Sequence, residues 1–195
     1  MKFTSVIVAL LALPAALASA IPRTTVAKRA TIETNGTYKI TSAFAPSVVI
    51  DLSAGDNKSI IAYPYHSGAN QQWIFNNTQG AWTIKNVELG LYIAPGNLSN
   101  PSATPGNYTT LSASSTPFIW DIWHDEVNPA AYRFFVPLTA LNWDLTDFGN
   151  STPGNPIQVF QKYTPGWKWQ TWTVDAGECF AVGRGRGAAD VHFPV

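Results

Sequence analysis

The tripeptide Gln71-Gln72-Trp73 closes a set of short, strand-like segments that the chain repeats three times. The other two copies of this closing tripeptide are Phe118-Ile119-Trp120 and Gln170-Thr171-Trp172. The copies follow one another at about 50 residues, a period that indicates a repeated supersecondary unit. One such unit cannot bury its own apolar face and has to pack against its copies. Three strand-like copies therefore predict a closed, threefold β structure.

Working outward from Trp73, the body of each repeat is made of short segments rich in β-branched and aromatic residues. In repeat one these are 36–40, 48–52, 59–63 and 73–75, separated by Gly-, Asn- and Ser-rich turns. Repeats two and three open in the same way at 80–84 and 131–134. The segments have no long helical period. Four strands in each repeat predict roughly twelve strands in an all-β, barrel-like fold.

The two ends of the chain differ from the repeats. Residues 1–20 combine Lys2, an apolar run and the small residues Ala18-Ser19-Ala20, which is the pattern of a secretory signal peptide. Residues 21–29 end in Lys28-Arg29, which resembles a dibasic processing site, so we expect a short propeptide. The repeats then form one domain at 30–175, and 176–195 are predicted to be a flexible tail or a gene-model artefact.

Six Asn-x-Ser/Thr motifs support the secretory route, because they are acceptors for glycans in secreted proteins. All six fall in segments predicted to be turns, where a bulky glycan can face water. The acceptor residues are Asn35, Asn57, Asn76, Asn97, Asn107 and Asn150.

Composition excludes several classes of protein. With 12 basic and 12 acidic residues and no clustered basic face in the repeats, binding to nucleic acid is not expected. The single cysteine, Cys179, allows no intramolecular disulfide and leaves a homodimer open. The three histidines are too far apart in the sequence to indicate a metal site, and we expect no metal and no cofactor.

The repeated closing motif, the Asp-Leu segment before a Gly/Asn-rich turn and the threefold period resemble the ricin-B-type β-trefoil lectins and family 13 carbohydrate-binding modules. The fungal branch of this family resembles the chain in one further motif. Its run Tyr-x-x-His-x-Gly-x-Asn-Gln-x-Trp matches residues 63–73. The resemblance covers about residues 34–174. It implies an all-β β-trefoil fold, in which Trp73, Trp120 and Trp172 are structural core residues and Gln71 and Gln170 brace the adjoining turns.

The resemblance also implies a sugar site in repeat one. Asp51 matches the acceptor for two neighbouring sugar hydroxyls, and Tyr63 matches the aromatic platform under the sugar ring. His66, Asn70 and Gln71 complete the main site. A glutamine common in plant members is Ile61 here, which removes one polar contact. Two alternatives stay open, namely that Asp51 caps a turn and that Tyr63 is an ordinary strand aromatic.

The other two repeats depart from the pattern to different degrees. Repeat two has Ala94 in the segment where an aspartate is expected and Phe118 in place of the motif glutamine, so its site is predicted to be lost. Repeat three keeps Asp144, Gln158, Phe160 and Gln170, which form the candidate second site. The asparagine position of repeat three is Trp169, which adds stacking surface or blocks the cleft.

Catalysis is not expected. The cluster of Asp121, His124, Asp125 and Glu126 has acid–base side chains, but it is predicted to lie in a solvated loop between repeats. The sequence therefore predicts a secreted, extracellular lectin that binds terminal galactose or N-acetylgalactosamine on glycans or glycoproteins, without insertion into a membrane. Two alternatives are a β-trefoil protease inhibitor that acts through the loops at 97–110 and 125–130, and a structural cell-wall protein with a decayed site.

Overall fold

The computed structural model describes residues 31–96, 104–163 and 167–177. The predicted signal peptide and propeptide, Asn97, Cys179 and residues 178–195 of the predicted tail lie outside the described residues. Ala176, the first residue assigned to that tail, ends the last strand. Within the described ranges, none of the helices has the length and apolar character needed to cross a bilayer.

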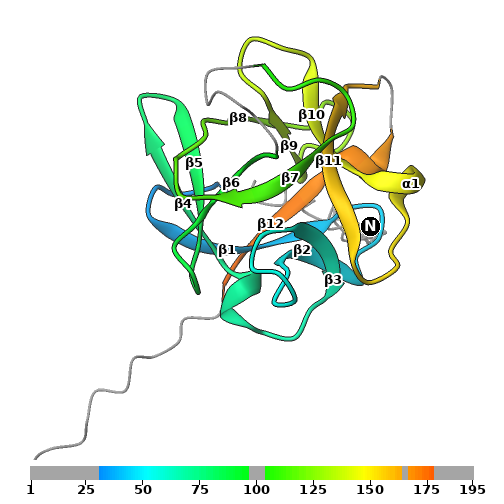
Figure 1. Ribbon diagram of the computed structural model, residues 1–195. Helices are drawn as coiled ribbons and strands as arrows, with labels where there is room; N and C mark the ends of the chain where they lie inside the picture. Colours follow the sequence, from blue (N-terminus) through cyan, green and yellow to red (C-terminus); the bar gives the residue numbers. More distant parts are fainter. Residues whose placement is uncertain (1–30, 97–103, 164–166, 178–195) are drawn as a thin grey trace, which may run out of the picture.

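The regular secondary structure of the described chain is almost entirely β-strand (Figure 1). Twelve strands are found in these residues, as the sequence predicted, with two single 3-10 turns (η1 and η2) and one short turn labelled α1. In chain order they are β1 (Gly36–Ser42), β2 (Val48–Leu52), β3 (Ile60–Pro64), η1 (Ala69–Gln71), β4 (Trp73–Thr78), β5 (Ala81–Asn86), β6 (Tyr92–Pro95), β7 (Thr109–Ser114), β8 (Asp121–His124), β9 (Tyr132–Phe135), β10 (Leu141–Leu145), α1 (Thr146–Gly149), β11 (Asn155–Gln161), η2 (Lys168–Gln170) and β12 (Trp172–Ala176).

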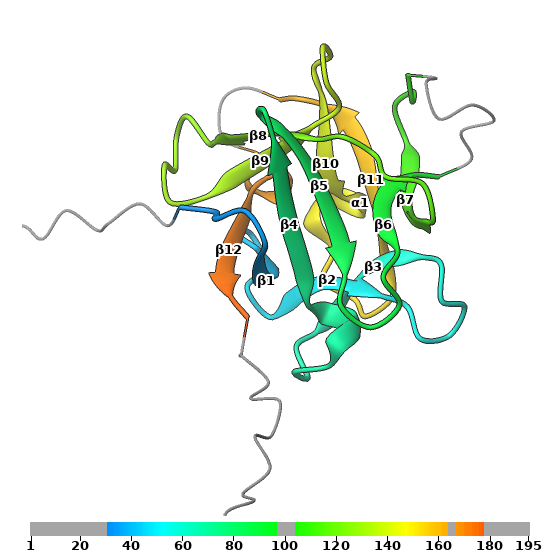
Figure 2. The same cartoon turned by 90° about the vertical axis from the view of Figure 1, so that its left-hand side faces the viewer.

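Six of the strands close a barrel. β1 pairs with β12 and β4, β4 pairs with β5, and β9 pairs with β8 and β12, all antiparallel. A bridge between Trp82 and Trp120 joins β5 to the start of β8 and completes the ring. The β4–β5 hairpin and the β1–β12 pair are seen side-on in Figure 2.

The other six strands form three hairpins that cap one end of the barrel. The hairpins are β2–β3, β6–β7 and β10–β11, one from each repeat. β11 pairs with both β3 and β7, and a bridge between Ser59 and Ser112 joins the first hairpin to the second. A six-stranded barrel capped by a triangle of hairpins is a β-trefoil, so the predicted fold is confirmed.

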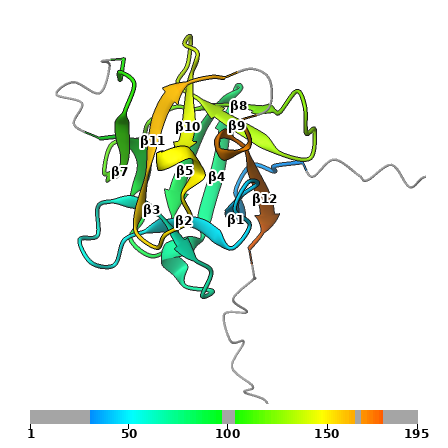
Figure 3. The same cartoon turned by 90° about the vertical axis from the view of Figure 1, so that its right-hand side faces the viewer.

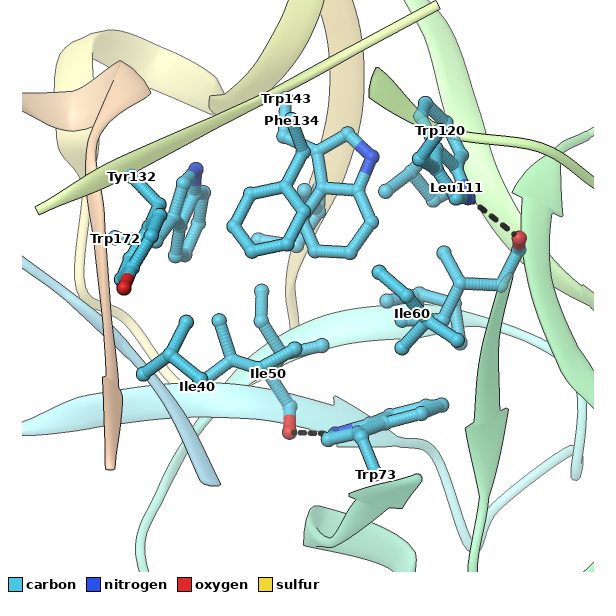
Figure 4. Close-up of a cluster of buried hydrophobic side chains, with 14 of the residues drawn as sticks. Ile40, Ile50, Ile60, Trp73, Leu111, Trp120, Tyr132, Phe134, Trp143 and Trp172 are labelled. Carbon is cyan, nitrogen blue, oxygen red and sulfur yellow. Dashed lines mark hydrogen bonds between the residues drawn. The ribbon is translucent and has the colours of Figure 1, made fainter. Parts of the chain in front are cut away.

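The core lies between the barrel and the hairpins (Figure 4). Trp73, Trp120 and Trp172 are all buried in it. The indole Nε1 of Trp73 donates to the carbonyl of Ile50 at 3.1 Å, and that of Trp120 donates to Ile93 at 3.0 Å. In the described residues, the Nε1 of Trp172 has no hydrogen-bond partner.

A fourth tryptophan breaks the threefold symmetry of the core. Trp143 stands on β10 where the other repeats have Ile50 and Ile93. Its ring stacks on Phe134 at 4.2 Å and meets Trp120 and Trp172 edge-on at 5.2 and 6.3 Å. The larger ring gives repeat three more buried aromatic surface than the isoleucines give the other two repeats.

Candidate functional site

The candidate site in repeat one centres on Asp51, which lies near the end of β2 and is 3% exposed. Its Oδ2 accepts hydrogen bonds from Nδ2 of Asn70 at 3.0 Å and from Nε2 of Gln71 at 2.8 Å. Both donors lie on η1, the turn that precedes the core residue Trp73. The structure thus brings Asp51, Asn70 and Gln71 together as the sequence predicted.

The amides of this site are themselves fixed by the backbone. Nε2 of Gln71 also donates to the carbonyl of Pro64, and its Oε1 accepts from the backbone N–H of His66 at 2.8 Å. Nδ2 of Asn70 also donates to the carbonyl of Leu52. A Cβ at Gly68 would collide with the side chains of Asn70 and His66, so any other residue there would displace two residues of the site. Such a fully bonded frame holds the Asp51 carboxylate in one orientation.

A cavity of about 250 Å³ opens over Asp51. In the described structure, no protein group donates to Oδ1 of Asp51, so this oxygen remains as an acceptor beside the cavity. Tyr63 is 41% exposed, and its ring meets that of His66 edge-on at 6.1 Å. The lining consists of Asp51, Ser53, Ala54, Gly55, Ile61, Tyr63, His66 and Asn70.

Burial raises the pKa of Asp51 above its ordinary value, because it removes water from the charged form. The hydrogen bonds from Gln71 and Asn70 and the nearby imidazole of His66 oppose this shift without reversing it. Nε2 of His66 lies 3.6 Å from Oδ2 of Asp51, and the imidazole is half exposed.

Repeat three has the same frame around Asp144. Nε2 of Gln170 donates to Oδ2 of Asp144 at 3.0 Å and to the carbonyl of Gln161, and its Oε1 accepts from the backbone N–H of Tyr163. Burial also raises the pKa of Asp144, with the bonds from Gln158 and Gln170 opposing it. The candidate second-site residues Asp144, Gln158, Phe160 and Gln170 are thus brought together.

The two sites differ at the position opposite the aspartate. Ile61 pairs with Asp51 across β2 and β3, whereas Gln158 pairs with Asp144 across β10 and β11. Isoleucine cannot donate, but Nε2 of Gln158 donates to Oδ1 of Asp144 at 3.0 Å. Both carboxylate oxygens of Asp144 therefore already have a partner, while Asp51 keeps one oxygen free.

The cavity over Asp144 measures about 470 Å³ and has residues that the sequence reasoning missed. The aromatic ones are Tyr108 just before β7, Phe148 on α1, and Tyr163 and Trp167 in the segment between β11 and η2. α1 lies beside β10 and β11 in Figure 3. The density of aromatic residues at 160–169 was the only signal in the sequence. Trp169 packs partly against the core and lines the cavity, which adds aromatic surface.

In the described part of repeat two, neither an acceptor nor an aromatic platform stands at the corresponding positions. Ala94 takes the place of the aspartate and pairs with Ser112 across β6 and β7. Phe118, in place of the motif glutamine, packs its ring against Trp120 at 4.8 Å. A brace like those of Gln71 and Gln170 cannot form there.

Two other expectations need correction. The cluster of Asp121, His124, Asp125 and Glu126 does not lie in a solvated loop throughout: Asp121 and His124 are the two ends of strand β8, and Asp125 is 5% exposed and accepts a hydrogen bond from Nε of the buried Arg133. Asn76 lies within strand β4 and not in a turn, although its side chain is exposed. The other described sequon residues, Asn35, Asn57, Asn107 and Asn150, are exposed as well.

In the described ranges, no three metal-ligating side chains come together.

The chain is similar to known lectins. The family model described as a ricin-type beta-trefoil lectin domain-like matches residues 69–160. The Macrolepiota procera ricin B-like lectin, solved in complex with lactose, is 47% identical and has a TM-score of 0.68. That alignment covers 75% of this chain and 99% of the lectin.

More distant structures share the fold. The Rhizoctonia solani agglutinin is 21% identical with a TM-score of 0.62, over 75% of this chain and 99% of the agglutinin. The designed threefold-symmetric protein ThreeFoil is 17% identical with a TM-score of 0.60, over 72% of this chain and 98% of ThreeFoil. No curated protein sequence matches the chain. With 47% identity over an alignment that spans almost the whole of that lectin, the chain belongs to the ricin B-like lectins, a family of carbohydrate-binding proteins.

Proposed function

We propose that this lectin is a secreted glycoprotein that binds terminal galactose or N-acetylgalactosamine through the repeat-one cavity, without turning its ligand over. The observation that carries the proposal is the free Oδ1 of the buried Asp51, held by Asn70 and Gln71 beside an exposed tyrosine. An ionised carboxylate only accepts hydrogen bonds, so it suits hydroxyl donors.

The roles of the lining residues follow from their chemistry. Asp51 accepts from neighbouring sugar hydroxyls, and the ring of Tyr63 offers an apolar surface to the C–H face of the sugar. Asn70 and His66 reach further hydroxyls, because amide and imidazole groups both donate and accept. The relative from Macrolepiota procera, whose structure contains lactose, supports a galactoside as ligand.

The size of the site predicts weak binding of single sugars. Four or five hydrogen bonds worth about 1 kcal/mol each give roughly −4 to −5 kcal/mol, which corresponds to a Kd near 1 mM. Tighter binding of cell-surface glycans would need a second site or a dimer, since linked sites raise the effective concentration.

Secretion and glycosylation are part of the proposal. The signal-like pattern of residues 1–20 supports export. The exposed side chains of Asn35, Asn57, Asn76, Asn107 and Asn150 support glycan attachment. Mass spectrometry of protein from a eukaryotic host, before and after removal of N-glycans, tests both points.

A glycan array tests the ligand. We expect the wild-type protein to bind galactose-terminated glycans and the Asp51→Ala variant to lose that binding. The Asp144→Ala variant is the matched control and should keep it. A folded wild-type protein that binds no glycan would contradict the proposal, and inhibition of a protease in a parallel panel would then favour the inhibitor alternative.

A further inference from the structure

Aromatic rings form a continuous series of contacts around the cavity of repeat three. Tyr108 meets Phe160 at 4.8 Å, Phe160 stacks on Tyr163 at 5.4 Å, and Tyr163 stacks on Trp167 at 4.0 Å. Trp167 then meets Trp169 at 4.5 Å. We call this cavity the aromatic cleft. Its polar floor is formed by Asp144 and Gln158.

The aromatic cleft is not a second copy of the repeat-one site. Phe160 stands at the platform position, but Tyr163 and Tyr108 already pack against its ring. Tyr63 in repeat one has a ring contact only with His66 among the described aromatic side chains. The ring of Phe160 is therefore less available to a sugar than the ring of Tyr63. The exposed apolar surface of the cleft lies instead on its rim, where Tyr108 is 70% and Phe148 76% exposed.

Phe148 is held at this rim by an unfavourable backbone. Asp147 and Phe148 have φ values of 52° and 56°, and Gly149 follows at 84°. A bulky residue with positive φ is a true outlier, and such strain gathers at functional sites. A Cβ at Gly149 would lie 2.5 Å from Phe44 and 2.9 Å from Trp169, so only glycine lets the loop pack there. The loop thus places the Phe148 ring against Trp169, at 6.1 Å.

Charge limits what the cleft can hold. Among the described residues that line it, the charged side chains are Asp144 and Asp147, and none is basic. Carboxylates repel sialylated, sulfated or phosphorylated ligands. The cleft therefore disfavours anionic ligands. Because the cleft has polar groups on its floor and aromatic rings on its walls, a ligand that fills it needs both a polar part and an apolar part.

We propose that the aromatic cleft is a second, non-equivalent binding site for neutral glycosides whose sugar carries an apolar aglycone. The sugar hydroxyls meet Asp144 and Gln158, and the aglycone packs against Trp167, Trp169 and Phe148. At about 470 Å³, against about 250 Å³ over Asp51, the cleft has room for both parts. The inference rests on the proposed function only because it takes the polar part of the ligand to be a sugar.

The test compares two ligands that differ only in the aglycone. Methyl β-galactoside and phenyl β-galactoside are titrated by calorimetry into the Asp51→Ala variant, which isolates the cleft from the repeat-one site. We expect the phenyl glycoside to bind at least tenfold more tightly. Equal affinities, or no binding of either glycoside by the folded variant, would overturn the inference.

Variants of the rim then locate the binding. In the Asp51→Ala background, Phe148→Asn should reduce the phenyl preference at least fivefold. It should leave the melting temperature unchanged or higher, because asparagine accepts positive φ better than phenylalanine. Trp167→Leu should also reduce the preference. Trp123→Leu, which changes a 63% exposed tryptophan outside the cleft, is the control and should keep it. A phenyl preference that survives both rim changes would refute the assignment.

Failure of this inference and failure of the proposed function give different results. The proposed function is tested by lactose binding in protein with Asp51 intact, whereas the cleft is tested with Asp51 removed. Phenyl glycoside binding without lactose binding would leave the cleft assigned and reject the galactose site. The reverse result would reject the cleft alone.

Discussion

Nε2 of Gln71 donates to Oδ2 of Asp51 across 2.8 Å, so the first residue of the closing motif in repeat one also holds the binding carboxylate. The same relation joins Gln170 to Asp144 at 3.0 Å in repeat three. A motif residue that looks purely structural therefore couples the core to the site. Repeat two, where this residue is Phe118, has lost the aspartate as well.

Gln71→Ala should weaken both folding and sugar binding. The change leaves the backbone N–H of His66 and the carbonyl of Pro64 without their partner and removes one donor to Asp51. Unpaired buried groups cost about 1–3 kcal/mol, which urea denaturation would detect. Gln161→Ala removes an exposed amide and serves as the control, with a change near zero. An unaltered free energy of unfolding for Gln71→Ala would contradict the role of this brace.

Acid should weaken sugar binding before it unfolds the protein. The pKa of Asp51 is raised by burial, so protonation removes the acceptor at a higher pH than for an ordinary aspartate. The same shift means that the charged form is disfavoured in the fold, and protonating Asp51 adds stability as pH falls through its folded pKa. Titration of lactose at a series of pH values, together with melting curves, measures both effects.

His66 has to be separated from this pH effect, because its imidazole lies 3.6 Å from Asp51. The His66→Gln variant keeps a polar side chain and removes the imidazole. We expect its affinity to fall with acid over the range set by Asp51 alone. Binding that is independent of pH in this variant would show that the carboxylate is not the acceptor.

The buried ion pair of Asp125 and Arg133 should stabilise the fold far more than the exposed ion pair of Lys162 and Glu126. Oδ1 of Asp125 lies 2.6 Å from Nε of Arg133, and both side chains are at most 5% exposed. Burial acts to raise the pKa of Asp125, but the hydrogen bond and charge of Arg133 and nearby backbone N–H groups outweigh it and lower the pKa. Since this pKa is lowered, the pair stabilises the fold above the unfolded pKa, and that contribution is lost as pH falls.

Arg133→Met should therefore cost about 3–5 kcal/mol, because it leaves a buried carboxylate alone. The variant also frees Oε1 of Gln170, which accepts from Nη1 of Arg133 at 3.1 Å. The control is Lys162→Met, which breaks the exposed pair with Glu126 and should cost about 0–1 kcal/mol. Similar costs for the two variants in urea denaturation would contradict this comparison.

The three motif tryptophans offer a test within one chain. Each Trp→Phe change removes similar volume, but Trp73 and Trp120 also lose a hydrogen bond to a backbone carbonyl. The Nε1 of Trp172 has no such partner in the described residues. Trp172→Phe should therefore destabilise the protein by about 1 kcal/mol less than either of the others. Equal losses in thermal unfolding would show that the two indole bonds contribute nothing.

Much of the fold and of the repeat-one site could be predicted from the sequence, because both depend on contacts close to the repeated motif. Asp51, Asn70 and Gln71 lie within one repeat, so their spacing in the sequence is enough to predict that their side chains lie close together. The walls of the aromatic cleft could not be predicted in this way. Tyr108 reaches it from repeat two, and Phe148 lies in a loop with no counterpart of similar length in repeat one.

The ion pair was missed for a related reason. Asp125 lies within the polar segment 124–128, which is typical of a solvated loop, and the sequence does not show that β8 pairs with β9. That pairing brings Arg133 beneath the loop. Arg133 also stands where repeat one has Lys39, which is partly exposed.

The most direct test of the account is a calorimetric titration of lactose into the wild-type protein and into the Asp51→Ala and Asp144→Ala variants. We expect binding near 1 mM for the wild type and for Asp144→Ala, and none for Asp51→Ala, because losing a hydrogen bond to a charged group costs about 1.5–3 kcal/mol. Lactose binding that survives in a folded Asp51→Ala variant, or that is lost in Asp144→Ala instead, would contradict the assignment of the repeat-one site.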